Sequence, residues 1–148
     1  MFTMKKFKMI DHTADIGIQV YGRKLDQLFE NAALGMFDIL CDIEKVNERN
    51  TYAIEISGKT TEELLHAWLG ELLYRQNTEG MLFMKFKVEI NGNNLTGKIK
   101  GEKYNPEKHC LKKEIKAVTY NSMQILQPDR RSKKTRERLF RTKIIFDV

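Results

Sequence analysis

Two groups of acidic residues in this 148-residue chain have types and spacing that could do chemistry. The first group is near the start, where Asp11 and Asp15 flank the short segment His12-Thr13-Ala14 between two predicted strands. A junction of this kind can present a carboxylate on a rigid support. Aspartates also commonly cap turns. The spacing of Asp11 and Asp15 leaves both interpretations open.

The second group is the chain end, Asp147 and Val148. Aspartate is uncommon in strands, yet Asp147 follows the apolar run Ile144–Phe146 and stands beside the terminal carboxylate. Two negative groups held this close repel each other unless water or a cation screens them. Oxygen ligands of this kind suit a hard cation such as Ca²⁺ or Mg²⁺. If the last strand lies beside the second, Asp15 joins Asp147 and Val148 in a site with three carboxylates.

Most of the positive charge lies near the C-terminus. Residues 128–148 contain eight basic and three acidic side chains, a net charge of +5, whereas the whole chain carries +6. Such a segment favours an acidic partner, most commonly nucleic acid, and a solvated loop is the alternative. No aromatic residue is interleaved in the basic run Arg130–Arg138, so this run offers no stacking platform for single-stranded RNA. The candidate contacts to RNA phosphates or to an acidic protein surface are Arg130, Arg131, Lys133 and Lys134.

Other signatures of catalysis are missing from the sequence. It contains no P-loop, GxGxxG, GxSxG or HExxH motif. The cysteines and histidines lack zinc-ligand spacing. Cys41 closes an apolar helical stripe, which predicts a buried structural thiol. A pairing of Cys41 with His12 across the fold stays open.

Composition and length indicate one folded domain spanning residues 1–148. Hydrophobic residues make up 41% and charged residues 31% of the chain, which excludes disordered and low-complexity classes. No apolar run approaches the roughly 20 residues of a membrane span. Without a recognisable signal peptide, the two cysteines are expected to be reduced and the protein cytoplasmic, with no membrane partner.

Hydrophobic periodicity predicts two helices and several strands. An apolar stripe predicts a helix over 25–40, and a capping box at Thr60 and Glu63 opens a second helix that ends near Gly80. His66 lies off the second stripe and is interpreted as a surface residue. Alternation predicts strands over 7–10, 16–21, 52–56, 82–90, 95–99, 114–126 and 142–148. This order predicts an α+β domain with two helices packed on one face of a mixed, mostly antiparallel sheet.

Several motifs occur in order over nearly the whole chain. They are Asp11–Ile18, Leu28–Ala33 with Met36–Asp38, Glu71–Tyr74, Glu114–Tyr120 and Ile144–Val148. Together they resemble the archease family, and the two ends of the chain carry the most specific matches.

The resemblance implies a role in RNA joining. Archeases are small α+β proteins without catalytic activity of their own. They are cofactors of the GTP-dependent RNA ligase that joins a 2′,3′-cyclic phosphate or 3′-phosphate end to a 5′-hydroxyl, as in tRNA splicing. They promote guanylylation of the ligase and its multiple turnover. Some have been proposed as chaperones for a tRNA cytosine methyltransferase, which is the alternative function here.

The resemblance also implies a metal site. The family's ligand positions match Asp15, Asp147 and Val148 in this sequence. Calcium is the ion expected from the family, with Mg²⁺ or Mn²⁺ as alternatives. A different class, a metal-dependent hydrolase built on Asp11, Asp15 and Asp147 with His12 as base, lacks an evident nucleophile.

The sequence departs from the family pattern in three places. Asn121 follows the Thr-Tyr pair where relatives often have His, and Cys110 follows His109 where they often have Pro. The loop Gln127–Phe140 is longer and more basic than the family pattern predicts. None of these differences touches Asp15 or Asp147, so they bear on the choice of partner.

Overall fold

The computed structural model of the protein describes residues 6–10 and 15–148. Within them, no helix combines the length and apolar character needed to cross a membrane. The elements in chain order are β1 (Phe7–Ile10), β2 (Asp15–Gly22), α1 (Leu25–Leu40), the 3₁₀ turn η1 (Ile43–Lys45), β3 (Asn50–Ser57), α2 (Thr61–Glu79), β4 (Met81–Asn91), β5 (Asn94–Lys103), β6 (Ala117–Val118), the 3₁₀ turn η2 (Thr135–Arg138) and β7 (Phe140–Asp147).

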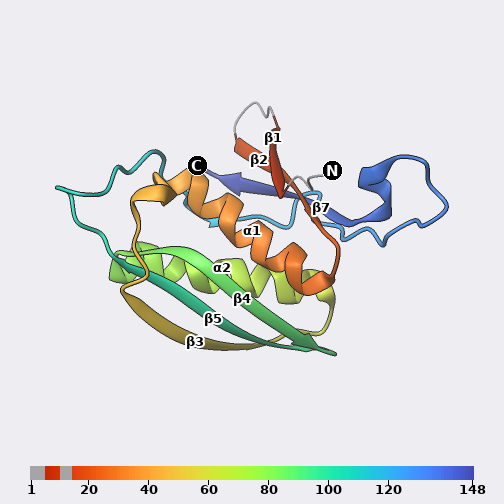
Figure 1. Ribbon diagram of the computed structural model, residues 1–148, viewed down its shortest axis with the longest axis horizontal. Helices are drawn as coiled ribbons and strands as arrows, with labels where there is room; N and C mark the ends of the chain where they lie inside the picture. Colours follow the sequence, from red (N-terminus) through yellow and green to blue (C-terminus); the bar gives the residue numbers. More distant parts are fainter. Residues whose placement is uncertain (1–5, 11–14) are drawn as a thin grey trace.

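The predicted α+β class with two helices is confirmed, and the strands divide between two sheets. One sheet has the order β1-β2-β7-β6 and the other β3-β5-β4. Every pairing between the described strands is antiparallel. Figure 1 shows α1 and α2 between the two sheets, so each sheet has helices on one face. The sequence pattern could not separate one sheet from two, because periodicity identifies strands but not their partners.

Helix α1 is buried on two sides because it contacts both sheets. Phe37 faces β4, where its ring centroid lies 5.6 Å from that of Phe83. Gly35 faces the other sheet: a Cβ there would lie 2.8 Å from Ile18 Cδ1 and 3.1 Å from Phe7 Cγ. A helix between two layers needs apolar or small residues on both sides, which a surface helix does not. The main hydrophobic cluster accordingly includes residues of both sheets and both helices.

Helix α2 has the ends that its sequence predicts. The Glu63 amide donates to Thr60 Oγ1 at 3.1 Å, and the Glu63 carboxylate accepts from the Lys59 amide at 2.9 Å. Gly80 ends the helix with φ of 68°, a left-handed conformation that glycine adopts without steric cost. On the buried side, Trp68 Nε1 donates to the Phe29 carbonyl at 3.0 Å, which connects α2 to α1.

The strand predicted over 114–126 is wrong for most of its length. Only Ala117–Val118 forms a strand on β7, and Leu126 adds an isolated bridge to Arg141. Between them lies a turn in which Ser122 has φ of 61°. The Thr119 hydroxyl stabilises this turn, since it accepts from the Asn121 amide at 3.2 Å. The alternation has another origin: an irregular segment buries its apolar side chains in the core. These are Ile115, Val118, Met123 and Ile125.

Candidate functional site

The acidic residues at the two ends of the chain meet across the strand pair β2–β7. Asp15 is the direct antiparallel partner of Asp147. Directly opposed side chains project from the same face of a sheet, with Cβ atoms about 4.5–5.5 Å apart. Val148 follows Asp147 at once. The condition for a three-carboxylate arrangement, that the last strand lies beside the second, is therefore met.

Strand alternation directs these carboxylates away from the core. Phe146, next to Asp147, is fully buried, and Ile16, next to Asp15, packs against the same cluster. Because neighbouring side chains in a strand point to opposite faces, both aspartates lie on the outer face of the sheet. Asp147 is exposed and Asp15 half-buried.

The neighbouring strand β6 places a small side chain beside Asp147. Ala117 is the partner of Asp147 on β6, and its methyl group covers little of the outer face. On the same strand pair, the Lys116 amide donates to the Asp147 carbonyl at 2.7 Å. The backbone of Asp147 is therefore hydrogen-bonded on both sides. This pairing fixes the position of the Asp147 Cα and the direction in which its side chain leaves the sheet.

The donor chemistry of this end suits a hard cation. Asp15, Asp147 and the Val148 carboxylate supply only oxygen, and Ca²⁺ takes six to eight oxygen ligands including water. Over residues 6–10 and 15–148, no three or more His, Cys, Asp or Glu side chains converge to hold a metal ion. Two acidic side chains with the chain-end carboxylate would leave coordination positions for water or for a partner's groups. Asp11 and His12, also singled out by sequence, lie outside the described residues.

The basic candidates lie far from the acidic pair. Arg130, Arg131, Lys133 and Lys134 are exposed in the loop that precedes β7. The acidic pair is at the other end of β7, about 23 Å away at the usual rise per strand residue. Figure 1 shows this separation: the C-terminus lies at the tip of β7, and the loop projects beyond the opposite end of that strand. A single small ligand cannot contact both groups.

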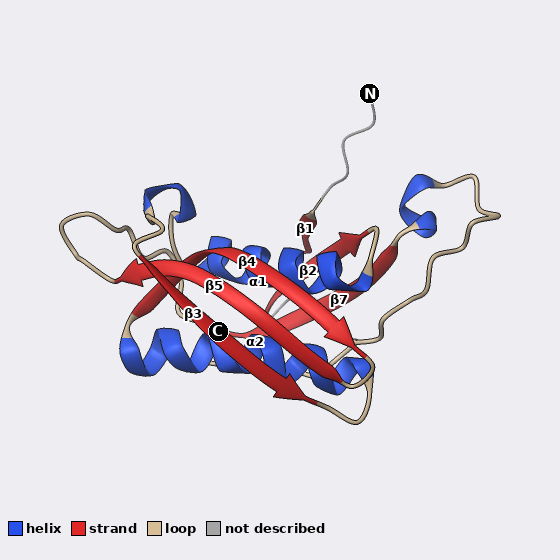
Figure 2. Cartoon of the chain, turned by 60° about the horizontal axis from the view of Figure 1, so that its bottom comes forward, coloured by secondary structure: helices blue, strands red, loops and turns tan. Residues whose placement is uncertain are grey.

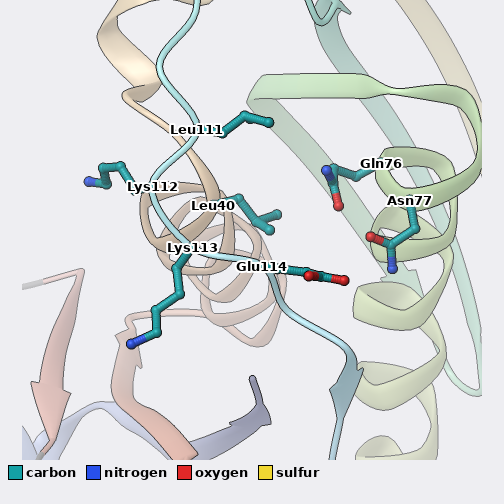
Figure 3. Close-up of a pocket in the computed structure, with 7 residues that line it drawn as sticks. All are labelled: Leu40, Gln76, Asn77, Leu111, Lys112, Lys113 and Glu114. Atoms are coloured by element: carbon teal, nitrogen blue, oxygen red, sulfur yellow. The ribbon is translucent and has the colours of Figure 1, made fainter.

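A separate cavity of about 350 Å³ lies where α1 ends beside α2 and the segment 111–114. Figure 3 shows its lining residues, which are Leu40, Gln76, Asn77, Leu111, Lys112, Lys113 and Glu114. Gln76 Oε1 is buried there without a hydrogen-bond donor from the described part of the chain. Neither Asp15 nor Asp147 lines this cavity, so it is not part of the acidic pair.

Comparison with known proteins identifies the family. The model of the archease protein family matches residues 7–148. The chain belongs to the archease family. The resemblance inferred from the sequence motifs is thus confirmed.

Individual relatives are similar to this chain over most of its length. Protein archease of Sulfolobus acidocaldarius is 46% identical over 128 residues, which cover 85% of this chain and 92% of that protein. Protein archease of Pyrococcus furiosus is 43% identical over 126 residues, or 82% of this chain and 89% of the relative. The solution structure of Methanobacterium thermoautotrophicum protein 1598 superimposes with a TM-score of 0.81 at 36% identity, over 98% of this chain and 100% of that one.

A buried charged cluster around Glu102 was missed by sequence reasoning. Glu102 Oε2 accepts from the Asn47 amide at 2.8 Å, from Lys108 Nζ at 2.7 Å and from His109 Nε2 at 2.8 Å. The hydrogen bond from Lys108 lowers the pKa of Glu102 to about 2, against the opposing effect of burial. The Asn105 amide donates to His109 Nδ1, which leaves Nε2 to carry the ring proton.

The Glu102 cluster fastens the segment after β5 to the sheet. Its members come from three places in the sequence, and 55 positions separate Glu102 from Asn47. No local pattern reports such a contact. Glu102 follows the strand predicted over 95–99, and a glutamate in a polar stretch is a weak signal for a buried charge.

The surroundings of His66 and of the two cysteines indicate structural roles. His66 is half-buried rather than on the open surface: its Nε2 lies 2.7 Å from the Val118 carbonyl, and its ring stacks on Tyr120 at 3.9 Å. Both cysteines are free. Cys41 is buried as predicted, and burial raises the pKa of its thiol to about 11. Cys110 is exposed.

Proposed function

We propose that this protein is a non-catalytic, metal-binding activator of the GTP-dependent RNA ligase that joins 2′,3′-cyclic phosphate or 3′-phosphate ends to 5′-hydroxyl ends. It promotes guanylylation of the ligase and multiple turnover, as in tRNA splicing. The observation that carries the proposal is the direct opposition of Asp15 and Asp147 on the outer face of a sheet, in a chain that belongs to the archease family. The two free cysteines agree with action in the reducing cytoplasm.

The acidic chain end is the part of the protein that approaches the ligase. Asp147 is exposed and sits at the end of its strand, so it can enter a neighbouring active site while β2 and β6 hold its backbone. Carboxylates placed in this way position divalent ions, which neutralise phosphate charge during nucleotidyl transfer. Because the ladder holds Asp15 and Asp147 in register, little ordering is needed when the complex forms.

The metal ligands in this proposal are Asp15, Asp147 and the Val148 carboxylate. Calcium is the proposed ion, and Mg²⁺ or Mn²⁺ would use the same oxygen donors. A bound divalent ion would neutralise the opposed carboxylates and present a positive charge to phosphate groups. The residues of this chain supply the negative charge and the geometry, and the ligase supplies the reacting groups.

The test is RNA ligation with the ligase limiting, in GTP and Mn²⁺. Wild-type protein should give many turnovers per ligase. Asp147→Asn removes one charge without changing side-chain size, and should reduce turnover to the level without added protein. Glu89→Gln is the matched control: Glu89 is exposed on β4 in the other sheet, so the same change of charge there should leave activation intact.

The outcomes separate the functions. Full activation by Asp147→Asn would remove the acidic pair from the mechanism. Equal turnover with and without wild-type protein would refute ligase activation and favour the alternative function, a chaperone for a tRNA cytosine methyltransferase. Hydrolysis of a phosphoester by the pure protein, lost in Asp15→Ala, would refute the non-catalytic assignment.

A further inference from the structure

The basic loop, residues 127–139, has a defined shape although it projects beyond the ends of the sheets (Figures 1 and 2). Arg141, on β7, connects both of its ends. Its Nη1 donates to the carbonyls of Glu137 at 2.9 Å and Leu139 at 3.2 Å, and more weakly to that of Gln127 at 3.4 Å. The backbone of Arg141 also pairs with Leu126 through bonds of 2.8 and 3.2 Å. The Arg141 guanidinium thus joins the two ends of the loop.

The two acidic residues of the basic loop accept hydrogen bonds from other residues of the same loop. Asp129 Oδ1 accepts from the Arg131 amide at 3.0 Å. Glu137 Oε2 accepts from the Ser132 hydroxyl at 2.6 Å. Both carboxylates therefore stabilise turns of the loop, and neither forms an ion pair with a loop cation.

The cations of the basic loop are left without compensating charge. Within the described ranges, no ion pair involves five exposed side chains: Arg130, Arg131, Lys133, Lys134 and Arg138. Arg136 differs, because its guanidinium lies over the Tyr21 ring at 5.6 Å from the centroid. A held loop that presents five unpaired cations attracts an anionic partner, and its order reduces the entropy lost on binding.

The side chains of the basic loop suit a phosphate backbone better than a protein surface. Hot spots of protein interfaces are enriched in Trp, Tyr and Arg, and of these three types residues 127–138 contain only arginine. Arginine and lysine alone are sufficient for contacts to nucleic-acid phosphates. Contacts to phosphates carry no direct sequence information, so binding should not depend on the base sequence.

We propose that the basic loop binds the phosphate backbone of RNA, with Arg130, Arg131, Lys133, Lys134 and Arg138 as phosphate contacts. Because β7 separates the loop from Asp147 by about 23 Å, the RNA bound there is remote from the acidic pair. The loop holds the RNA, and the acidic pair acts elsewhere. This binding requires no ligase, so it is tested independently of the proposed function.

The experiment measures binding of a fluorescently labelled RNA hairpin to the full chain by anisotropy over a series of salt concentrations. The loop variant replaces Arg130, Arg131, Lys133 and Lys134 by Gln. Log K falls as log salt concentration rises, and each lost phosphate contact makes this negative slope shallower by about 1. The slope for the variant should therefore be shallower by up to about 4. Its affinity for the RNA at low salt should be more than about tenfold weaker.

A matched control removes the same charge elsewhere. Lys85, Lys87, Lys98 and Lys100 are the lysines on the outer face of the β3-β5-β4 sheet, and their replacement by Gln lowers the net charge equally. This control should keep most of the affinity and the slope. The four substituted loop side chains are exposed, and Lys85 and Lys100 of the control form only surface ion pairs with Glu48. Both variants should therefore melt within a few degrees of wild type. Pairwise variants, Arg130 with Arg131 and Lys133 with Lys134, should each lose about half of the slope change.

Three results would overturn the proposal. Equal losses in the loop variant and the control would mean that only net charge attracts RNA. An unchanged slope in the loop variant would place the RNA on another surface. Absence of RNA binding by wild type, together with loss of ligase binding in the loop variant, would identify an acidic protein surface as the partner.

Discussion

The replacement of Glu102 by Gln tests how the buried cluster stabilises the fold. Glu102 is 5% exposed, and its Oε2 accepts from Asn47, Lys108 and His109. Hydrogen bonds to a charged group contribute about 1.5–3 kcal/mol each, and those between neutral groups about 0.5–1.5. Glutamine keeps the shape and one acceptor but removes the charge, so three bonds weaken by about 1 kcal/mol each. The bond from Lys108 counts least, because that side chain is 34% exposed.

The expected loss in the free energy of unfolding at neutral pH is therefore about 2–3 kcal/mol. In a chain of this size it corresponds to a fall in Tm of roughly 5–10 °C. The pH dependence follows from the pKa of Glu102, which is lowered from 4.5 to about 2 in the folded protein. Between these values the unfolded chain binds more protons, so stability rises with pH. The contribution of Glu102 is complete above its unfolded pKa and disappears as the pH falls toward 2.

The assay is urea denaturation of wild type and Glu102→Gln from neutral pH downward. The gap in unfolding free energy should be largest at neutral pH and should close as the pH falls through the range between the two pKa values. Glu107→Gln is the matched control, since Glu107 is an exposed glutamate in the adjacent segment. A gap that stays constant with pH would show that the charge of Glu102 is not the cause. An equal effect of Glu107→Gln would show that the effect is not specific to the cluster.

Three further predictions concern packing, thiol chemistry and metal. Gly97→Ala should destabilise the protein by about 1–3 kcal/mol, because a Cβ there would lie 2.9 Å from the Trp68 ring; an unchanged urea midpoint would contradict this packing. Cys110 should react with a thiol reagent in the native protein and Cys41 only on unfolding, since Cys41 is buried with a pKa of about 11; equal rates would refute it. Ca²⁺ at a hundred times its Kd should stabilise wild type by about 2.7 kcal/mol but not Asp147→Asn, as measured by thermal melting.

Local structure could be predicted because its causes are local. The stripe from Leu25 to Leu40 and the Thr60–Glu63 capping box each lie within one segment, and both helices have the predicted bounds within a residue. The exception, 114–126, shows the limit of the same method. Alternation reports which side chains are buried, and in that segment all of them except Val118 are buried outside a strand ladder.

The candidate site could be identified only from the sequence and the tertiary structure together. The sequence by itself determined that carboxylates stand at both ends of the chain, that the positive charge is concentrated in one loop, and that the motifs belong to the archease family. Only the tertiary structure decided that β2 pairs with β7 in a register that opposes Asp15 and Asp147. It also decided that the basic loop lies at the far end of β7 and that Glu102, Asn47 and His109 meet. Pairing and register arise from contacts between residues distant in sequence, which no short-range pattern encodes.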